Sequence, residues 1–266
     1  MKFHKIICLI ITFLSFISCE KEIQIDVDET DPKLVIEAQM SNRMGDAIVI
    51  LTNSRNLNDS SSPEKITGAE IYITEIESQT IFTLNETEEG IYKNENLQGE
   101  IGKTYYLEIL LPNGQTFSSL QTMPIMVDLH EVRYEEKDSP FADDEDDPTF
   151  DLRPIFMDPL GIDNYYQYII TRNGIKEKGI FINKDLGFDG EENSQRLSIE
   201  ANYGDIIRVD LHNVTPSAYD FLLGAQLNLS QATATPTNPI SNIEGDALGY
   251  FKVFSAGEPI SFTLEE

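Results

Sequence analysis

Short hydrophobic runs with a period of two constrain the fold of this chain more than any other feature. From Lys33 onward, brief stretches alternate apolar with polar side chains or are rich in β-branched residues. Gly, Asn, Pro or Ser interrupts these stretches at intervals of roughly ten residues, a spacing typical of β-sandwiches and barrels. Because successive side chains of a strand point to opposite faces, each stretch predicts a strand with one buried face. The sequence therefore predicts an all-β protein.

The first group of predicted strands indicates a β-sandwich over residues 33–125. Its strand candidates are KLVIEAQM, DAIVILTNS, GAEIYITEI, TIFTLNE, GIYKNE and GKTYYLEILLPNGQTF. Residues 112–115 predict a hairpin turn, because Asn-Gly readily adopts the positive φ that tight turns need. The stretch from GIY to GEIGKTYYLEI also resembles sandwiches of the transthyretin or carboxypeptidase-regulatory type. That resemblance covers this stretch alone.

The second group of predicted strands indicates another β-sandwich over residues 126–266, with one helical insertion. Its strand candidates are DLHEVRYEE, FDLRPIFMD, NYYQYIITRNG, KGIFINKD, QRLSIEA, DIIRVDLHNV, ALGYFKVFS and PISFTLEE. The helix is expected near residues 216–230, where Thr215 can cap it and Pro216 suits its first turn. Its apolar face would consist of Tyr219, Leu222 or Leu223, and Leu227. We therefore expect two tandem sandwiches of the immunoglobulin or transthyretin type.

The N-terminal segment has the pattern of an export signal. Two lysines precede the apolar stretch Ile6–Ile17, which is shorter than the ~20 residues of a transmembrane helix. Cys19, which follows it, is either incidental to an ordinary signal peptide or the lipidated residue of a bacterial lipoprotein. Residues 16–19, Phe-Ile-Ser-Cys, resemble a lipobox, with Phe16 where Leu is usual. This resemblance favours a lipoprotein signal peptide over residues 1–18 and a lipid on Cys19.

The residues after Cys19 form a predicted acidic tether, which extends over residues 19–32. The alternation in EIQIDV leaves a short edge strand open as an alternative. The acidic residues of this segment also resemble the short signals that send Bacteroidota lipoproteins to the cell surface. We therefore expect a protein anchored in the outer membrane by lipid and facing the cell exterior. Several acyl chains on one cysteine would make that attachment stable.

The charge balance argues against nucleic acid as a partner. The chain has 46 acidic and 19 basic residues, and removal of residues 1–18 would take away Lys2 and Lys5 and no acid, so the net charge would change from −27 to −29. Nucleic-acid binders need basic patches, and so acidic a body would not lie flat on anionic lipid. Solubility alone also explains this charge. With Cys8 removed and Cys19 acylated, no free thiol would remain for catalysis or metal binding.

The sequence lacks the motifs of common hydrolases. It contains neither His-Glu-x-x-His nor Gly-x-Ser-x-Gly, and beyond the signal peptide its histidines are His130 and His212. Each histidine follows a leucine in a strand pattern, so we expect both at the surface or at a sheet edge. Acidic pairs are abundant, but a glycosidase pair is recognised by its separation in space. We expect no enzymatic activity, with a carboxylate-based hydrolase as the least favoured alternative.

Two acidic stretches are candidates for calcium binding, and no other cofactor is expected. Residues 185–196 match the EF-hand loop at its first, fifth and sixth positions, with Asp185, Asp189 and Gly190. They depart from it at the third and at the twelfth, where Arg196 replaces the bidentate Glu. Solvated loops are the simpler interpretation. The second stretch offers the carboxylates of Asp143, Asp144 and Asp146 without a fixed geometry.

Aromatic residues of one predicted strand are candidates for a binding surface. Tyr166 and Tyr168 share a face of that strand, and Tyr165 lies on the opposite face. Tyrosine is favoured at interfaces, although one face of the strand must pack in the core.

The connection 233–249 is long enough to be a candidate functional loop. The segment NPISNIEGDALGYF, which includes Asn242 and Tyr250, lies at the end of this connection. We expect Gly245 and Gly249 to form turns there. Asn242 and Tyr250 complete the candidate binding residues.

Several segments together resemble a family of Bacteroidota outer-membrane lipoproteins, domain of unknown function 4249. They are the lipobox, KLVIEAQMSN, ITGAEIYI, GIYKNENLQGEIGKTYYLEI, MP, NYYQYIITRNG, AYDFLLGAQLN and NPISNIEGDALGYF. They occur in order over nearly the whole chain after Cys19. Asp246 stands where a second glycine is common in the family. The resemblance implies a lipoprotein often encoded beside a TonB-dependent transporter, with no known reaction or catalytic residues.

These observations favour a non-catalytic binding module. We expect a lipoprotein that docks onto a TonB-dependent outer-membrane transporter or delivers a ligand to it. The alternative is a stand-alone adhesin or glycan-binding protein, and the third hypothesis is the carboxylate-based hydrolase.

Overall fold

The computed structural model describes residues 32–55, 61–137, 148–193, 195–230 and 237–266. The predicted signal peptide, nearly all of the predicted tether, and the calcium candidates Asp143, Asp144 and Asp146 lie outside these residues. In the first half of the chain the strands are β1 (Leu34–Ser41), β2 (Ala47–Asn53), β3 (Glu70–Glu75), β4 (Thr80–Glu88), β5 (Ile91–Asn94), β6 (Thr104–Leu110) and β7 (Thr116–Thr122).

The second half contributes nine strands and a helix within the described residues. They are β8 (Glu131–Glu136), β9 (Thr149–Ile155), β10 (Tyr165–Arg172), β11 (Ile175–Lys176), β12 (Phe181–Lys184), β13 (Leu197–Glu200), β14 (Ile206–Val214), α2 (Pro216–Leu229), β15 (Ala247–Ala256) and β16 (Ile260–Thr263). The predicted all-β fold with one helix is therefore confirmed.

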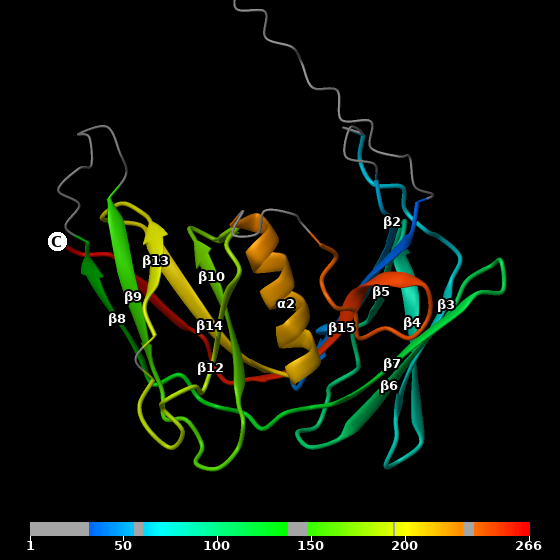
Figure 1. Ribbon diagram of the computed structural model, residues 1–266, viewed down its shortest axis with the longest axis horizontal. Helices are drawn as coiled ribbons and strands as arrows, with labels where there is room; N and C mark the ends of the chain where they lie inside the picture. Colours follow the sequence, from blue (N-terminus) through cyan, green and yellow to red (C-terminus); the bar gives the residue numbers. More distant parts are fainter. Residues whose placement is uncertain (1–31, 56–60, 138–147, 194, 231–236) are drawn as a thin grey trace, which may run out of the picture. The chain divides into compact units, whose positions relative to one another are not determined.

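The first sandwich is a sheet that folds over on itself around one core. Its hydrogen-bonded order is β15-β1-β2-β5-β4-β3-β6-β7, and Figure 1 labels β2 to β7 and β15 of this sheet. Strand β4 pairs with both β5 and β3, and its pairing with β5 has a register shift between Glu86 and Glu88. Residues from β1 and β2 share a buried cluster with residues from β3 and β6, which are distant in the strand order. In β1, alternate residues are buried, as a period of two requires.

The second sandwich packs a separate three-stranded sheet against β10 and β14. The small sheet has the order β13-β9-β8, while β12 pairs with β10 and β16 with β14. Side chains of both layers form one hydrophobic cluster, which includes Phe150 and Leu152 of β9 and Tyr166 and Tyr168 of β10. The alternation of apolar residues predicted these layers, since each strand gives one face to the cluster.

Strand β15 belongs to both sandwiches. It runs parallel to β1 from Leu34↔Ala247 to Ser41↔Phe254, and its last residues pair antiparallel with β14, as in His212↔Ala256. Four residues from this part of the chain, Ile243, Ala247, Phe251 and Val253, pack in the core of the first half of the chain. The predicted division at residues 125 and 126 stays a prediction, but the sheet continues across it through β15.

Gly249 permits this parallel pairing and does not form a turn as predicted. It lies within β15 at φ 109°, opposite Ile36. A Cβ atom on Gly249 would lie 1.9 Å from the carbonyl oxygen of Ile36, so only glycine lets the two backbones approach so closely.

Helix α2 begins and ends where the sequence predicts. The Thr215 hydroxyl accepts a hydrogen bond from the amide of Ala218 over 3.4 Å, and Pro216 occupies the first turn. Tyr219 and Leu222 are buried as expected, whereas Leu227 is 38% exposed. No helix of the described residues is both long and apolar enough to cross a membrane.

The hairpin at residues 112–115 is confirmed, and it joins β6 to β7. Gly114 has a φ of 86°, and the amide of Gln115 donates to the Asn113 side chain over 3.0 Å. The positive φ is confined to Gly114, so the Asn side chain acts here as a hydrogen-bond acceptor for the turn.

Candidate functional site

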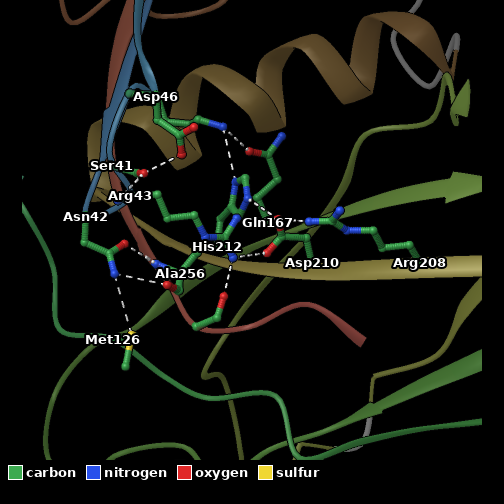
Figure 2. A network of polar contacts seen from close by, with 12 residues as sticks. Ser41, Asn42, Arg43, Asp46, Met126, Gln167, Arg208, Asp210, His212 and Ala256 are labelled. Carbon is green, nitrogen blue, oxygen red and sulfur yellow. Dashed lines mark hydrogen bonds and ion pairs between the residues drawn. The ribbon is translucent and has the colours of Figure 1, made fainter. Parts of the chain in front are cut away.

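A buried group of polar side chains joins β10, β14 and β15, and Figure 2 shows it from close by. Lys252 of β15 is 4% exposed and donates a hydrogen bond to Gln167 Oε1 over 3.0 Å. Its nitrogen lies 3.5 Å from His212 Nδ1 and 4.3 Å from the centre of the Phe254 ring. Lysine is almost never fully buried unless it is paired, so these contacts compensate for its loss of water.

Asp210 connects this group to the turn between β1 and β2. Arg43 of that turn donates two bonds to Asp210, of 2.7 Å to Oδ2 and 2.9 Å to Oδ1. Such a bidentate pair is among the stronger hydrogen-bonded contacts. His212 Nε2 lies 3.4 Å from Asp210 Oδ2. We refer to Arg43, Gln167, Asp210, His212 and Lys252 as the Lys252 network.

The same turn also holds the end of β15. Asn42 donates to the Ala256 carbonyl over 3.1 Å and accepts from the Ala256 amide over 2.8 Å (Figure 2). Arg43 donates in addition to the carbonyl of Gly257. The β1–β2 turn is thus fixed to β14 and β15 by side chains as well as by the sheet.

Burial and charge together set the protonation of the Lys252 network. Burial lowers the pKa of Lys252 to about 7, and the nearby charge of Lys176 acts in the same direction. Burial also lowers the pKa of His212 to about 4, despite the opposing effect of Asp210. Burial alone would raise the pKa of Asp210, but hydrogen bonds from His212 and Arg43 outweigh it and hold that pKa well below its ordinary value.

At neutral pH the network therefore combines an ionised Arg43–Asp210 pair, a neutral His212 and a partly protonated Lys252. Because Nδ1 of His212 faces the Lys252 ammonium, the neutral ring carries its proton on Nε2, which lies 3.4 Å from Asp210 Oδ2. The prediction that His212 lies at the surface is wrong. The residue is 7% exposed because β10 and β15 flank β14 on both sides. His130 is exposed, as predicted.

The Lys252 network contains residue types that are common in catalytic sites, but its side chains contact one another inside the protein. Its lysine and histidine are turned toward protein partners and are 4% and 7% exposed, so neither faces a solvent-filled space. Perturbed pKa values arise in structural ion-pair networks as well as in active sites. Here the perturbed groups join the β1–β2 turn to strands of the second sandwich.

The structure brings the calcium candidates Asp185 and Asp189 together with a third carboxylate, Asp158. One carboxylate oxygen of each residue lies within 4.8 Å of the others, and we call this group the aspartate cluster. Asp158 is 3% exposed, and its Oδ1 accepts a hydrogen bond from the Tyr166 hydroxyl. Burial raises the pKa of Asp158, and the charges of Asp185 and Asp189 add to that effect.

The β9–β10 connection and the loop that follows β12 form hydrogen bonds with each other at both of their ends. These bonds bring the three aspartates of the cluster together. At one end, the amide of Asp158 donates to the Glu191 carbonyl over 3.0 Å. At the other end, the amide of Asn164 donates to Asp185 Oδ2 over 3.2 Å. Between these contacts, the amide of Gly161 donates to Asp189 Oδ1 over 2.6 Å. The residues that resembled an EF-hand loop thus meet the β9–β10 connection instead of forming a self-contained calcium loop.

Tyr166 and Tyr168 are core residues. They are 0% and 1% exposed and pack in the second sandwich, so neither ring is available to a partner at the surface. Tyr165 lies on the opposite face, as the alternation predicts, and packs against Tyr219 of α2 with ring centroids 5.2 Å apart. We expected one face of this strand to pack in the core. In the structure, helix α2 covers part of the opposite face.

Asn242 has a structural role in the candidate loop. Its side chain accepts from the Phe251 amide over 2.8 Å and donates to the Phe251 carbonyl over 3.0 Å, as a neighbouring strand would. The side chain also donates to Ser217 Oγ over 3.1 Å. These bonds use both N–H groups and the oxygen of the amide, and they attach the loop to β15 and α2.

Tyr250 borders a surface hollow of about 180 Å³. The ring is half-buried beside Phe221 of α2, with centroids 4.6 Å apart, and burial raises the pKa of its hydroxyl to about 12. The hydroxyl therefore remains a hydrogen-bond donor at any physiological pH. The lining residues are Glu37, Ala38, Gln39, Ile48, Ile50 and Tyr250.

The fold and the sealed polar network define a β-sandwich protein whose two halves share a strand. The chain belongs to the family described as Domain of unknown function (DUF4249), whose model matches residues 20–259. No curated protein matches the chain.

Two solved structures are similar in part. A two fibronectin type-III domain segment from chicken tenascin is 9% identical, with 89% of this chain and 100% of that chain covered and a TM-score of 0.24. The central fibronectin-III array of RIM-binding protein is 14% identical, with 68% of this chain and 62% of that chain covered and a TM-score of 0.17.

Sequence reasoning missed Asp158, Lys252, Asp210 and Arg43. Asp158 is a single acid in PIFMDPL and has no acidic residue next to it in the sequence. Lys252 and Asp210 interrupt the apolar runs ALGYFKVFS and DIIRVDLHNV at positions that become buried. No local pattern marks these positions, because a charged residue between apolar neighbours is also what a solvent-facing strand position shows, as at the exposed Arg208.

Proposed function

We propose that this protein is a lipid-anchored, non-catalytic binding module of the outer membrane, of the kind found in Bacteroidota. In this proposal Cys19 carries the lipid, residues 19–32 form the tether, and the two sandwiches face the cell exterior. The partner would be a TonB-dependent transporter, which the module serves as an accessory subunit. The observation that carries the proposal is the order of segments: a lipobox, an acidic tether, and then a folded body.

The anchor follows from the N-terminal sequence. A short apolar stretch that ends in Ser-Cys and gives way to acidic residues fits cleavage before Cys19. The family match begins at residue 20, directly after this cysteine. The high negative charge of the chain would keep the body off an anionic bilayer, so attachment would depend on the lipid.

The contacts of the buried lysine and histidine support the proposal of a non-catalytic role. The buried lysine and histidine of the Lys252 network contact each other, Gln167 and Asp210, and they hold strands together. With β15 shared between the sandwiches, this network makes a firm scaffold that presents loops to a partner. Recognition by loops on a rigid scaffold needs no bond to be made or broken.

Co-purification tests the transporter partner. The tagged full-length protein is extracted from its native membranes in mild detergent, and the proteins that accompany it are identified by mass spectrometry. We expect a TonB-dependent β-barrel in near-equal amount. Recovery of the protein alone would contradict the accessory role.

The Cys19→Ala variant serves as the control for anchoring. It should appear in the soluble fraction and lose the barrel, because it lacks the lipid. A variant that retains the barrel without the lipid would show that the partner binds the sandwiches directly.

Glycan binding is a second candidate function, favoured by the hollow beside Tyr250. An aromatic ring next to the carboxylate of Glu37 and the amide of Gln39 offers stacking together with hydrogen bonding. A glycan array tests this candidate with the wild-type protein and a Tyr250→Ala variant. Binding that the variant loses would favour a stand-alone glycan-binding protein, and absence of binding would remove this candidate.

A further inference from the structure

We propose that the aspartate cluster of Asp158, Asp185 and Asp189 is a calcium site. It lies between the β9–β10 connection and the loop that follows β12. The site is independent of the partner proposed above, and its test does not require that partner.

The first argument is geometric. Calcium binds oxygen atoms at 2.3–2.6 Å, so two oxygens on opposite sides of one ion lie about 5 Å apart. One carboxylate oxygen from each of the three aspartates lies within 4.8 Å of the others. The three oxygens can therefore contact a single ion without movement of the backbone.

The second argument is an oxygen atom without a partner. Asp158 is 3% exposed, and its Oδ1 accepts from the Tyr166 hydroxyl. Its Oδ2 is buried and accepts no hydrogen bond of ordinary length and angle, although the Gly190 amide lies near enough to the carboxyl to lower its pKa. A buried carboxylate oxygen without a partner is costly, because it has lost its water and gained nothing in return. A cation between the three aspartates would supply the missing interaction.

The third argument concerns charge. Three carboxylates converge here, and within the described part of the chain no lysine, arginine or histidine forms a salt bridge with any of them. Like charges at this distance repel each other unless a counter-ion or a proton intervenes. The Lys252 network, by contrast, pairs its own carboxylate with Arg43.

The fourth argument is that the protein positions these ligands before any ion binds. The Gly161 amide fixes Asp189, the Asn164 amide fixes Asp185, and the Tyr166 hydroxyl fixes Asp158. Each aspartate thus has one contact that orients it. Ligands oriented by neighbouring groups are characteristic of built metal sites.

The ligand set selects calcium among common cations. Hard oxygen ligands exclude soft metals, and magnesium needs near-ideal octahedral geometry at 2.0–2.1 Å. Three carboxylates with water in the remaining positions fit the weaker calcium sites of extracellular modules, with a Kd of about 10⁻⁴–10⁻³ M.

Calcium titration of the full-length protein in detergent tests the proposal. After treatment with EDTA, calcium chloride is added, and binding is followed by calorimetry and by the unfolding temperature. We expect one saturable site, and at about tenfold excess over Kd the unfolding temperature should rise by roughly 3–6 °C. Magnesium chloride at the same concentration should give a smaller rise.

Three variants distinguish this site from general attraction of calcium to an acidic protein. Asp189→Asn is exposed and should fold normally, yet its calcium affinity should fall about tenfold or more. Asp158→Asn should lose calcium affinity to the same extent. Its unfolding temperature in EDTA should not fall, because the Asn side chain still accepts the hydrogen bond from Tyr166. Asp163→Asn, an exposed aspartate of the same connection outside the cluster, should bind as the wild type does.

Two results would overturn the proposal. One is the absence of saturable binding to the wild-type protein up to about 10 mM calcium, an order of magnitude above the weakest expected Kd. The other is a failure of the variants to distinguish the site. Either Asp189→Asn would bind calcium with the affinity of the wild type, or Asp189→Asn and Asp163→Asn would lose the same amount of calcium affinity.

Discussion

Replacing Lys252 with methionine should change how the stability of the protein depends on pH. Burial lowers the pKa of Lys252 to about 7, whereas lysine in an unfolded chain has its ordinary pKa of 10.5. Below pH 7 both states bind the proton, so Lys252 contributes no pH dependence there. Between pH 7 and 10.5 only the unfolded state binds it, and the free energy of unfolding therefore rises with pH.

The size of this effect follows from the pKa difference. At about 1.4 kcal/mol for each tenfold change, a pKa lowered from 10.5 to about 7 corresponds to roughly 5 kcal/mol. The wild type should gain this amount relative to Lys252→Met between pH 7 and 10.5. Methionine has a similar shape and no charge, so the variant should be at least as stable as the wild type near pH 7.

Urea unfolding at a series of pH values measures the difference between the two proteins. Other titrating groups are shared by both proteins and cancel in the difference. A difference that stays constant from pH 7 to 10.5 would refute the reasoning, because it would mean that Lys252 keeps an ordinary pKa in the folded protein.

Two further substitutions test the contacts that join the sandwiches. Gly249→Ala should cost more than about 3 kcal/mol or prevent folding, because its Cβ would lie 1.9 Å from the Ile36 carbonyl, whereas Gly174→Ala, with a φ of 81° and open space around it, should cost only about 1 kcal/mol. Thermal unfolding compares the stability of the two alanine variants. Equal losses of stability in both would contradict the close approach of β1 and β15. Arg43→Met should cost about 3 kcal/mol in urea unfolding at pH 7, because it leaves the buried Asp210 without its bidentate partner. A loss below about 0.5 kcal/mol, as for a surface ion pair, would contradict the role given to this contact.

The local elements of the fold were predictable from the sequence because their signals are local. Alternation places Tyr165 opposite Tyr166, and Thr215 followed by Pro216 marks the start of α2. The Asn113-Gly114 pair marks a hairpin for the same reason. Each of these signals depends on neighbours within a few residues.

The long-range pairings were not predictable in the same way. Nothing in ALGYFKVFS specifies that it runs parallel to LVIEAQMS, because a period of two fixes the buried face of a strand and not its partner. The burial of His212 depends on the same pairing, since β15 covers one side of β14. The turn expected at Gly249 was wrong for this reason as well.

The aspartate cluster was predictable only in part. Asp185 and Asp189 stand close together in an EF-hand-like pattern, which local spacing reveals. Asp158 joins them through backbone bonds between two loops that are far apart in the sequence, and no local pattern reveals such bonds. The exact ligand set of a site between loops therefore requires the structure.

The mass of the mature N-terminal peptide tests the central claim, that Cys19 anchors this β-sandwich protein to a membrane. The full-length protein is purified from native membranes and digested, and its N-terminal peptide is analysed by mass spectrometry. We expect a peptide that begins at Cys19 and carries a diacylglycerol group. An N-terminal peptide that begins elsewhere, or one that begins at Cys19 without lipid, would contradict it.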